Sequence, residues 1–284
     1  MLIDVRGLTY TYHKAKEPAI RELGFGIERG EIFGFLGPSG AGKSTTQKVL
    51  IGLLRDFQGE VEVLGKPLSE WGADLYERIG ISFEFPNHYS KLTGRENLRY
   101  FGTLYQNQAH SPEELLDWVG LNQDGDVLVS QYSKGMKNRL NVARALIHDP
   151  DLLFMDEPTA GLDPVNARNV KDLIARQRDQ GKTIFLTTHD MTVAGELCDR
   201  LAFIVDGRID LIDSPRSLKL KHGEARVRVE YSANGGTEAE SFPLEGLAEN
   251  PAFLNVLRKP VQTIHSQEAT LERIFIEVTG RRLV

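Results

Sequence analysis

The stretch Ile32-Phe33-Gly34-Phe35-Leu36-Gly37-Pro38-Ser39-Gly40-Ala41-Gly42-Lys43-Ser44 decides the fold of this chain. Its first five residues form a short, continuous apolar run, which is typical of a buried strand. The next eight match the pattern Gly-x-x-x-x-Gly-Lys-Ser, and helical spacing follows from Thr45. A strand, a glycine-rich turn and a helix in this order predict a phosphate-binding loop, because backbone N–H groups and the helix start then point at an anion.

This loop supplies most of the candidate ligand contacts. Lys43 is expected to reach the β- and γ-phosphates of a nucleotide, and Ser44 to offer its hydroxyl to Mg²⁺. The glycines let backbone N–H groups turn inward around phosphate oxygens. The predicted contacts of the loop are Gly37, Pro38, Ser39, Gly40, Ala41, Gly42, Lys43, Ser44 and Thr45.

A second element carries two adjacent acids. The apolar strand pattern of residues 152–155 runs directly into Asp156 and Glu157. There Asp156 can hold Mg²⁺ through its water shell, and Glu157 can orient and polarise an attacking water. An Asp-Glu pair alone also suits a solvated turn, but together with a phosphate loop the catalytic interpretation is the stronger. The chain lacks the Asn-Lys-x-Asp sequence with which a GTPase reads its base.

Composition limits the other function classes. Of the 284 residues 40% are hydrophobic and 26% charged, an ordinary globular mix with room for one large domain and an appendage. The formal net charge of −6 argues against a nucleic-acid partner, because the one basic stretch, Lys219 to Arg228, is short and interrupted by Glu224. The single cysteine, Cys198, excludes an intrachain disulfide and suits a reducing cytoplasm. No run approaches the roughly 18 apolar residues that span a bilayer, so work at a membrane would need a partner.

The order of predicted elements indicates an α/β fold. Strands that alternate with helices favour a mainly parallel sheet. We therefore expect a P-loop NTPase core with such a sheet, an antiparallel N-terminal β-region, an inserted α-helical subdomain and a small α+β C-terminal extension. Strand patterns occur at residues 2–10, 20–28, 32–36, 60–64, 152–155, 183–187, 201–205 and 208–212.

The same patterns suggest domain limits. The ATPase domain would span residues 1–215, with its helical subdomain at about 86–147. Residues 216–284 would form the extension, whose role the sequence does not reveal. In that extension, residues 269–278 carry one apolar helical stripe, which we expect to pack within its own domain.

Further motifs follow in a fixed order. Tyr132-Ser133-Lys134-Gly135-Met136 precedes the acidic strand, Ala160-Gly161-Leu162-Asp163 follows the acid pair, and Thr187-Thr188-His189 ends the next strand. Tyr12 stands near the N-terminus in the context Leu-Thr-Tyr-Thr-Tyr. Together with the phosphate loop and the acids, this order resembles the ABC ATPase family over residues 1 to about 215.

The resemblance implies that two chains share each ATP. Ser133 to Met136 is similar to the family's signature, usually Leu-Ser-Gly-Gly-Gln. Ser133, Lys134, Gly135 and Met136 would then contact the γ-phosphate of ATP held by a second subunit, with a helix N-terminus facing the anion. Two copies would sandwich two ATP molecules head to tail, and ATP would act as a dimerising ligand.

The resemblance also assigns the remaining site residues. Tyr12 would stack on adenine, Asp163 would pass information across the dimer, and His189 would contact the γ-phosphate and sense hydrolysis. Alone, Tyr12 also suits a packing aromatic and His189 a strand-end histidine, but the joint order favours the functional interpretation. The predicted catalytic residues are Glu157, His189 and Lys43.

Two departures from the family pattern bear on function. Glu84 stands where the family has a glutamine, and it adds a negative charge near the acid pair. We expect Glu84 still to ligate Mg²⁺, with Ser44 and Asp156, but to alter the coupling between nucleotide and membrane partner. Lys134 and Met136 replace a glycine and a glutamine, and Lys134 places a cation near the polyphosphate.

These departures, with Leu92–Leu98 and Ala269–Gly280, are similar to the ATPases of bacitracin- and daunorubicin-type exporters. Such ATPases pair with a separate six-helix permease of the ABC-2 type. The resemblance therefore implies a homodimer on the cytoplasmic face of the membrane, with residues 84–105 as the docking surface for the permease. Two alternatives stay open: an ABC-type ATPase without a membrane role, and a regulatory nucleotide-binding module without turnover.

Overall fold

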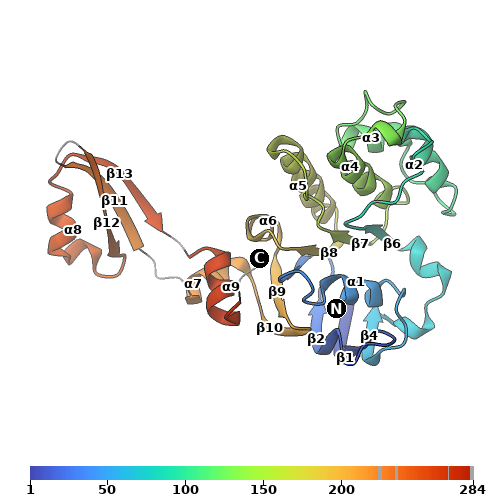
Figure 1. The fold of residues 1–284 in the computed structure, drawn as a ribbon, viewed down its shortest axis with the longest axis horizontal. Helices are drawn as coiled ribbons and strands as arrows, with labels where there is room; N and C mark the ends of the chain where they lie inside the picture. Colours follow the sequence, from blue (N-terminus) through green and yellow to red (C-terminus); the bar gives the residue numbers. More distant parts are fainter. Residues whose placement is uncertain (223–225, 234–235, 268, 282–284) are drawn as a thin grey trace. The chain divides into compact units, whose positions relative to one another are not determined.

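The computed structural model describes residues 1–222, 226–233, 236–267 and 269–281. They form two compact units, Met1–Asp213 and Ser214–Arg281 (Figure 1). Residues 223–225, in the basic stretch noted above, lie outside the described residues. Within the described ranges, no helix is both long and apolar enough to cross a membrane.

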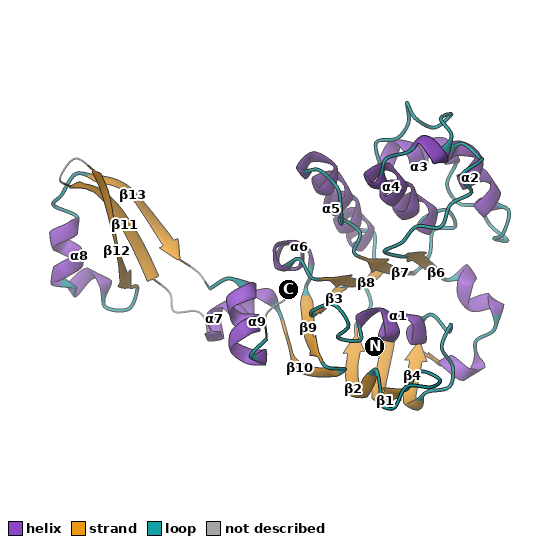
Figure 2. Cartoon of the chain, viewed as in Figure 1, coloured by secondary structure: helices purple, strands orange, loops and turns teal. Residues whose placement is uncertain are grey.

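A six-stranded sheet forms the centre of the first unit, with strand order β10-β9-β3-β8-β7-β6; Figure 2 labels these strands. Neighbouring strands pair in parallel except β9 and β10, a hairpin that turns at Asp206-Gly207. The predicted mainly parallel sheet is confirmed. Its strands are β3 (Ile32–Leu36), β6 (Ile79–Ser82), β7 (Leu152–Asp156), β8 (Thr183–Thr188), β9 (Arg200–Val205) and β10 (Arg208–Asp213).

A second sheet is antiparallel, as predicted for the N-terminal region, and its strand order is β2-β1-β4-β5. Both sheets share one hydrophobic core with helix α1 (Lys43–Leu50). Four phenylalanine rings in this core, Phe25, Phe33, Phe35 and Phe185, have neighbouring centroids 5.4 to 6.5 Å apart. This packing fixes β3 and the loop that leaves it. The strands are β1 (Ile3–Tyr10), β2 (Ile20–Ile27), β4 (Gln58–Val63) and β5 (Lys66–Pro67).

The predicted helical insertion is also confirmed, and its helices α2, α3 and α4 lie together (Figure 2). Serine or threonine caps each of them; Thr93 with Glu96, and Ser111 with Glu114, form capping boxes. The helices of the first unit are α2 (Gly94–Gly102), α3 (Pro112–Trp118), α4 (Lys134–Ala145), α5 (Pro164–Asp179) and α6 (Met191–Leu197). Short 3-10 turns occupy Leu68–Glu70, Ala73–Glu77 and Val129–Gln131.

The second unit combines a three-stranded antiparallel sheet, order β12-β11-β13, with helices. Val229 and Tyr231 of β11 pack with Phe253 and Val256 of α8 in a small core of its own. Helix α9 contacts α7 and buries its predicted apolar stripe at Leu271–Phe275. The elements are α7 (Pro215–His222), β11 (Arg226–Ala233), β12 (Gly236–Pro243), a 3-10 turn (Leu247–Glu249), α8 (Pro251–Val256), β13 (Val261–Gln267) and α9 (Leu271–Thr279).

Candidate functional site

The carboxyl ends of four parallel strands converge on one pocket. Strands β3, β8, β7 and β6 are neighbours in the sheet, so the residues that follow them meet at one edge. The phosphate loop leaves β3, His189 leaves β8, Glu157 leaves β7 and Glu84 follows β6. The pocket measures about 470 Å³ and is lined by Ser39, Gly40, Gly42, Lys43, Ser44, Thr45, Glu84, Asp156, Glu157 and His189.

The backbone of the phosphate loop admits only glycine at two predicted positions. Gly42 has φ 110°, and a Cβ at Gly37 would lie 2.1 Å from the carbonyl oxygen of Ile204. The loop is closed by its own contacts, since the carbonyl of Pro38 accepts from the amide of Ala41 at 3.2 Å. The result is a tight turn that starts α1 with its N–H groups toward the pocket.

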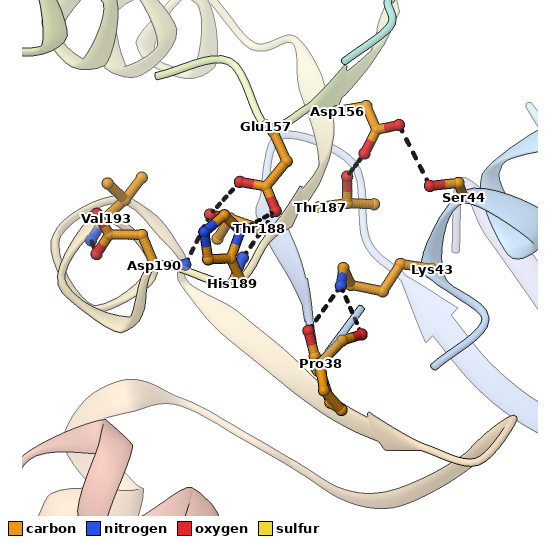
Figure 3. Close-up of polar contacts among 11 residues, drawn as sticks. Pro38, Lys43, Ser44, Asp156, Glu157, Thr187, Thr188, His189, Asp190 and Val193 are labelled. Atoms are coloured by element: carbon orange, nitrogen blue, oxygen red, sulfur yellow. Dashed lines mark hydrogen bonds and ion pairs between the residues drawn. The ribbon is translucent and has the colours of Figure 1, made fainter. Parts of the chain in front are cut away.

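Lys43 occupies the centre of this turn. Its Nζ donates to the carbonyl oxygens of Gly37, at 2.6 Å, and Pro38, at 3.0 Å (Figure 3). Burial lowers the pKa of Lys43, and the carboxylates of Glu157 and Asp156 oppose that shift. The ammonium group is thus held by weak neutral acceptors, which an anionic phosphate could replace with a stronger, charge-assisted bond.

Asp156 lies across the pocket from the start of α1. The hydroxyl of Thr187 donates to its Oδ1, and the Oγ of Ser44 lies 3.4 Å from its Oδ2 (Figure 3). Burial raises the pKa of Asp156, with a smaller contribution from Glu157, while the bond from Thr187 lowers it. Ser44 and Asp156 therefore present two oxygens side by side.

Glu157 is held on both carboxylate oxygens. Thr188 Oγ1 donates to Oε2 at 3.0 Å, and Oε1 lies 2.9 Å from the amide nitrogen and 2.7 Å from Nδ1 of His189 (Figure 3). Its side chain is only 8% exposed and its φ is 48°, a conformation unusual outside glycine. Strained backbone at a well-supported polar residue is common at functional sites.

Glu84 completes an acidic wall. Burial raises the pKa of its carboxyl group, and the charges of Asp156 and Glu157 raise it further. Three carboxylates thus face one lysine, an imbalance that a divalent cation would relieve. Among the described residues, no group of three or more His, Cys, Asp or Glu side chains is arranged to hold a metal ion. The donors present suit Mg²⁺, which takes one or two protein oxygens and completes its shell with water and phosphate.

Tyr12 lies at the edge of the phosphate loop. Its hydroxyl oxygen is 3.1 Å from Thr45 Oγ1, and its ring stands edge-on to Tyr10 with centroids 5.0 Å apart. The residue is 39% exposed, so a ring face remains open to a planar ligand.

The remaining predicted residues line a different pocket. It measures about 340 Å³ and, among the described residues, shares no lining residue with the first. Ser133 caps α4 by accepting from the amide of Met136 at 3.1 Å, and Asp163 caps α5 through the amides of Val165 and Asn166. The lining residues are Ser133, Lys134, Gly135, Met136, Arg139, Gly161, Leu162, Asp163 and Asn166. The structure therefore does not bring Ser133–Met136 or Asp163 to the phosphate loop of the same chain.

The hydroxyls that hold the acid pair were not among the predicted site residues. Thr187 and Thr188 contact Asp156 and Glu157 because β7 and β8 pair with Asp156 opposite Thr187. Arg139, which lines the second pocket, was also missed; it donates to the carbonyls of Val119 and Gly120. The sequence signal for the threonines was their position at the end of a strand. That signal identifies their contacts with the acids only when the pairing of β7 with β8 is known.

Comparison with known proteins shows the same architecture. A family model described as "ABC transporter" matches residues 20–160, and one described as "Fluoroquinolone efflux ABC transporter C-terminal domain" matches residues 225–268. A dimeric ATP-binding cassette, solved in a post-hydrolysis state with ADP and phosphate, is 27% identical with a TM-score of 0.69 and covers 75% of this chain and 99% of its own.

Two curated relatives extend over almost the whole chain. A fluoroquinolones export ATP-binding protein of Mycobacterium tuberculosis is 61% identical over 99% of this chain and 94% of its own length. The Nod factor export ATP-binding protein I of Neorhizobium galegae is 40% identical over 100% of this chain and 86% of its own. The chain, with its phosphate loop, acid pair and fold, belongs to the ABC transporter family as an ATP-binding subunit with ATPase activity.

Proposed function

We propose that this chain drives export through a separate membrane permease by binding Mg-ATP between two copies of itself. Residues 1–215 would be the ATPase domain, with the helical subdomain at about 86–147, and residues 216–284 the extension. Export is supported by relatives named for the export of fluoroquinolones and of Nod factor, and by the fluoroquinolone efflux match within the extension. Two further parts of this proposal are that the permease is of the ABC-2 type and that this chain lies on the cytoplasmic face of the membrane.

The phosphate-loop pocket would supply most of the chemistry. Lys43 and the loop amides bind the β- and γ-phosphates, and Tyr12 stacks on adenine. Ser44, Asp156 and Glu84 hold Mg²⁺, which neutralises charge that develops on the phosphates. Glu157, fixed by Thr188 and His189, orients the attacking water, and His189 contacts the γ-phosphate. Support comes from the convergence on one pocket of the side chains of Lys43, Ser44, Glu84, Asp156, Glu157 and His189.

One observation supports the dimer: among the described residues, the second pocket shares no lining residue with the first. Ser133 caps a 12-residue helix, α4, whose N-terminus favours an anion, and Lys134 and Arg139 add positive charge. Because this pocket and the phosphate loop are separate in one chain, we infer that the ATP bound by one copy is completed by the second pocket of the other. The post-hydrolysis relative is itself a dimer.

The permease would dock beside Glu84, on residues 84–105. There Phe85, Tyr89, Tyr100 and Leu104 expose 77%, 48%, 44% and 61% of their surface. Tyr89 and Leu104 also line a groove of about 630 Å³, whose other aromatic lining residues are Tyr76, Phe83, Phe101 and Tyr105. Exposed apolar clusters of this kind favour a protein contact.

The test is the oligomeric state with ATP. The variant Glu157→Gln should bind ATP, lose hydrolysis by about 100-fold or more, and stay a dimer in size-exclusion chromatography with light scattering. Glu157→Gln combined with Ser133→Arg should remain monomeric, because the arginine fills the second pocket. A matched control, Glu157→Gln with Ser130→Arg, changes a nearby serine outside that pocket and should still dimerise. Monomers with ATP in every variant would overturn the proposal.

The two alternatives give other results. A regulatory module without turnover would release no phosphate from ATP in the wild-type chain. An ABC-type ATPase without a membrane role would hydrolyse ATP yet fail to associate with any permease encoded beside it, measured by co-purification from membranes.

A further inference from the structure

Helix α4 contacts the segment that follows the catalytic acid. The Nδ2 of Asn138 donates to the carbonyl oxygens of Pro158, at 3.2 Å, and Ala160, at 3.1 Å. Asn138 is 4% exposed, and these carbonyls belong to the turn directly after Glu157. Hydrogen bonds to buried backbone carbonyls are costly to break, because the carbonyls are left without a donor.

The same helix contacts the segment that carries Glu84. The Nδ2 of Asn141 donates to Ser82 Oγ at 3.0 Å and to the carbonyl of Phe83 at 2.7 Å. Asn141 is fully buried, and its Oδ1 accepts from Arg144 at 2.7 Å. Arg144 also donates to the carbonyl of Asn87 at 2.7 Å, so α4 holds this segment on both sides of Glu84.

Helix α4 begins at its N-cap residue, Ser133, which lines the second pocket. Asn138 and Asn141 are three residues apart and therefore share one face of the helix. Asn141 lies eight residues from Ser133, about 12 Å along the helix axis. Over so short a distance a helix moves as one rigid piece, and a shift at the cap reaches both acid-bearing segments.

We propose that Asn138 and Asn141 make α4 a positioning helix, which sets Glu157 and Glu84 of its own pocket relative to the Ser133 cap that serves a second copy. Asn138 acts on the water-orienting acid, and Asn141 acts on the metal-binding acid. Neither residue touches ATP. This inference rests on the proposed function and adds a physical link between its two pockets.

Asn97 offers a matched control. It is also a buried asparagine of the helical subdomain, 1% exposed, and its Nδ2 donates to the carbonyls of Tyr89 and Thr93. Those bonds stay within the loop that precedes its own helix. Loss of Asn97 should therefore destabilise the fold without moving Glu157 or Glu84.

The experiment replaces each asparagine with leucine in the full-length chain. Asn138→Leu should lower kcat for ATP about tenfold and leave KM within about twofold, since a small displacement of a catalytic base slows chemistry more than binding. Asn138→Gln, which keeps the carboxamide, should recover most of the rate. Asn141→Leu should weaken Mn²⁺ binding at least about threefold, measured by electron paramagnetic resonance of free Mn²⁺ with a non-hydrolysable ATP analogue.

The loss of kcat and the loss of Mn²⁺ affinity should each belong to one variant only. Asn138→Leu should leave Mn²⁺ affinity unchanged, and Asn97→Leu should change neither kcat nor Mn²⁺ affinity despite a lowered unfolding midpoint. Equal effects of all three variants, or a wild-type kcat in Asn138→Leu, would overturn the proposal. If a leucine variant does not fold, the isosteric Asn138→Asp and Asn141→Asp variants carry the same expectations. Glu157→Gln in the same assay tests the proposed function separately, because it loses turnover whatever Asn138 does.

Discussion

The two pockets of the first unit distribute charge in opposite ways. The phosphate-loop pocket sets three carboxylates, Glu84, Asp156 and Glu157, against Lys43. The second pocket has Lys134 and Arg139 beside a helix N-terminus, and the carboxylate of Asp163 is engaged in capping α5. The first therefore suits the phosphates of a nucleotide together with a metal ion and water, and the second suits an anion alone. This difference in charge is the physical reason for proposing that the second pocket of one copy completes the ATP site in the first pocket of another.

The largest effect should come from the lysine of the first pocket. Lys43→Ala removes a half-buried ammonium group whose charge-assisted bonds to phosphate are worth about 2–3 kcal/mol, or roughly a 100-fold loss of ATP affinity. Isothermal titration calorimetry with ATP would measure it. Affinity within a factor of three of wild type would show that the loop amides alone bind the phosphates.

The lysine of the second pocket should matter less and at a different step. Lys134 is exposed, so Lys134→Ala should raise the ATP concentration needed for dimerisation about fivefold and leave ATP binding by the monomer unchanged. The effect should shrink as salt rises, since salt screens an exposed charge. Equal weakening of monomer binding would place Lys134 at the phosphates of its own chain and remove the distinction between the pockets.

The acidic wall should give the first pocket a pH dependence. The pKa of Glu84 is raised, so as pH falls Glu84 becomes protonated above the ordinary glutamate range and loses its charge for the metal. The Mg²⁺ concentration for half-maximal hydrolysis should therefore rise on acidification. In Glu84→Gln this rise should be about threefold smaller, because the variant has no carboxyl group to titrate at that position. Identical pH dependence in both proteins would exclude Glu84 from the metal site.

The smallest effect should be a loss of thermal stability on replacing Asp163, a helix-capping residue of the second pocket. Asp163→Ala removes the acceptor for the amides of Val165 and Asn166, a helix cap worth about 1 kcal/mol. The midpoint of thermal unfolding should fall by about 2–4 °C. No shift would mean that the carboxylate is free to act across the dimer instead of holding α5.

Local sequence patterns predicted the helices and strands that have a clear hydrophobic period or a motif. The helices and strands that were not predicted depend on contacts between residues far apart in the chain. The apolar run and glycines of residues 32–44 were sufficient for β3 and the phosphate loop. Helix α5 was not predicted, because its buried face has only three apolar residues, Val170, Leu173 and Ile174, and then continues with polar Gln177. Strand β6 has four residues and is stabilised by its pairing with β7, which no local pattern reveals.

The candidate site divides in the same way. Motif order located the loop, the acids and the second pocket's residues. It could not reveal that Thr187 and Thr188 hold the acids, since that depends on the register of β7 with β8. Asn138 and Asn141 were also not predicted as site residues, because their hydrogen-bond partners, Pro158 and Ser82, lie 20 and 59 residues away along the chain.

The left-handed backbone of Glu157, with φ of 48°, has a consequence for evolution and engineering. A glutamate in this region costs about 1 kcal/mol relative to a residue such as glycine or asparagine that adopts it readily. Selection for thermal stability alone would favour Glu157→Gly or Glu157→Asn, which relieve that cost and, under the catalytic role proposed for Glu157, abolish turnover. Random variants selected for heat resistance should therefore include variants at position 157 that lack ATPase activity. Selection for stability in this chain should accordingly be combined with an activity assay in every round.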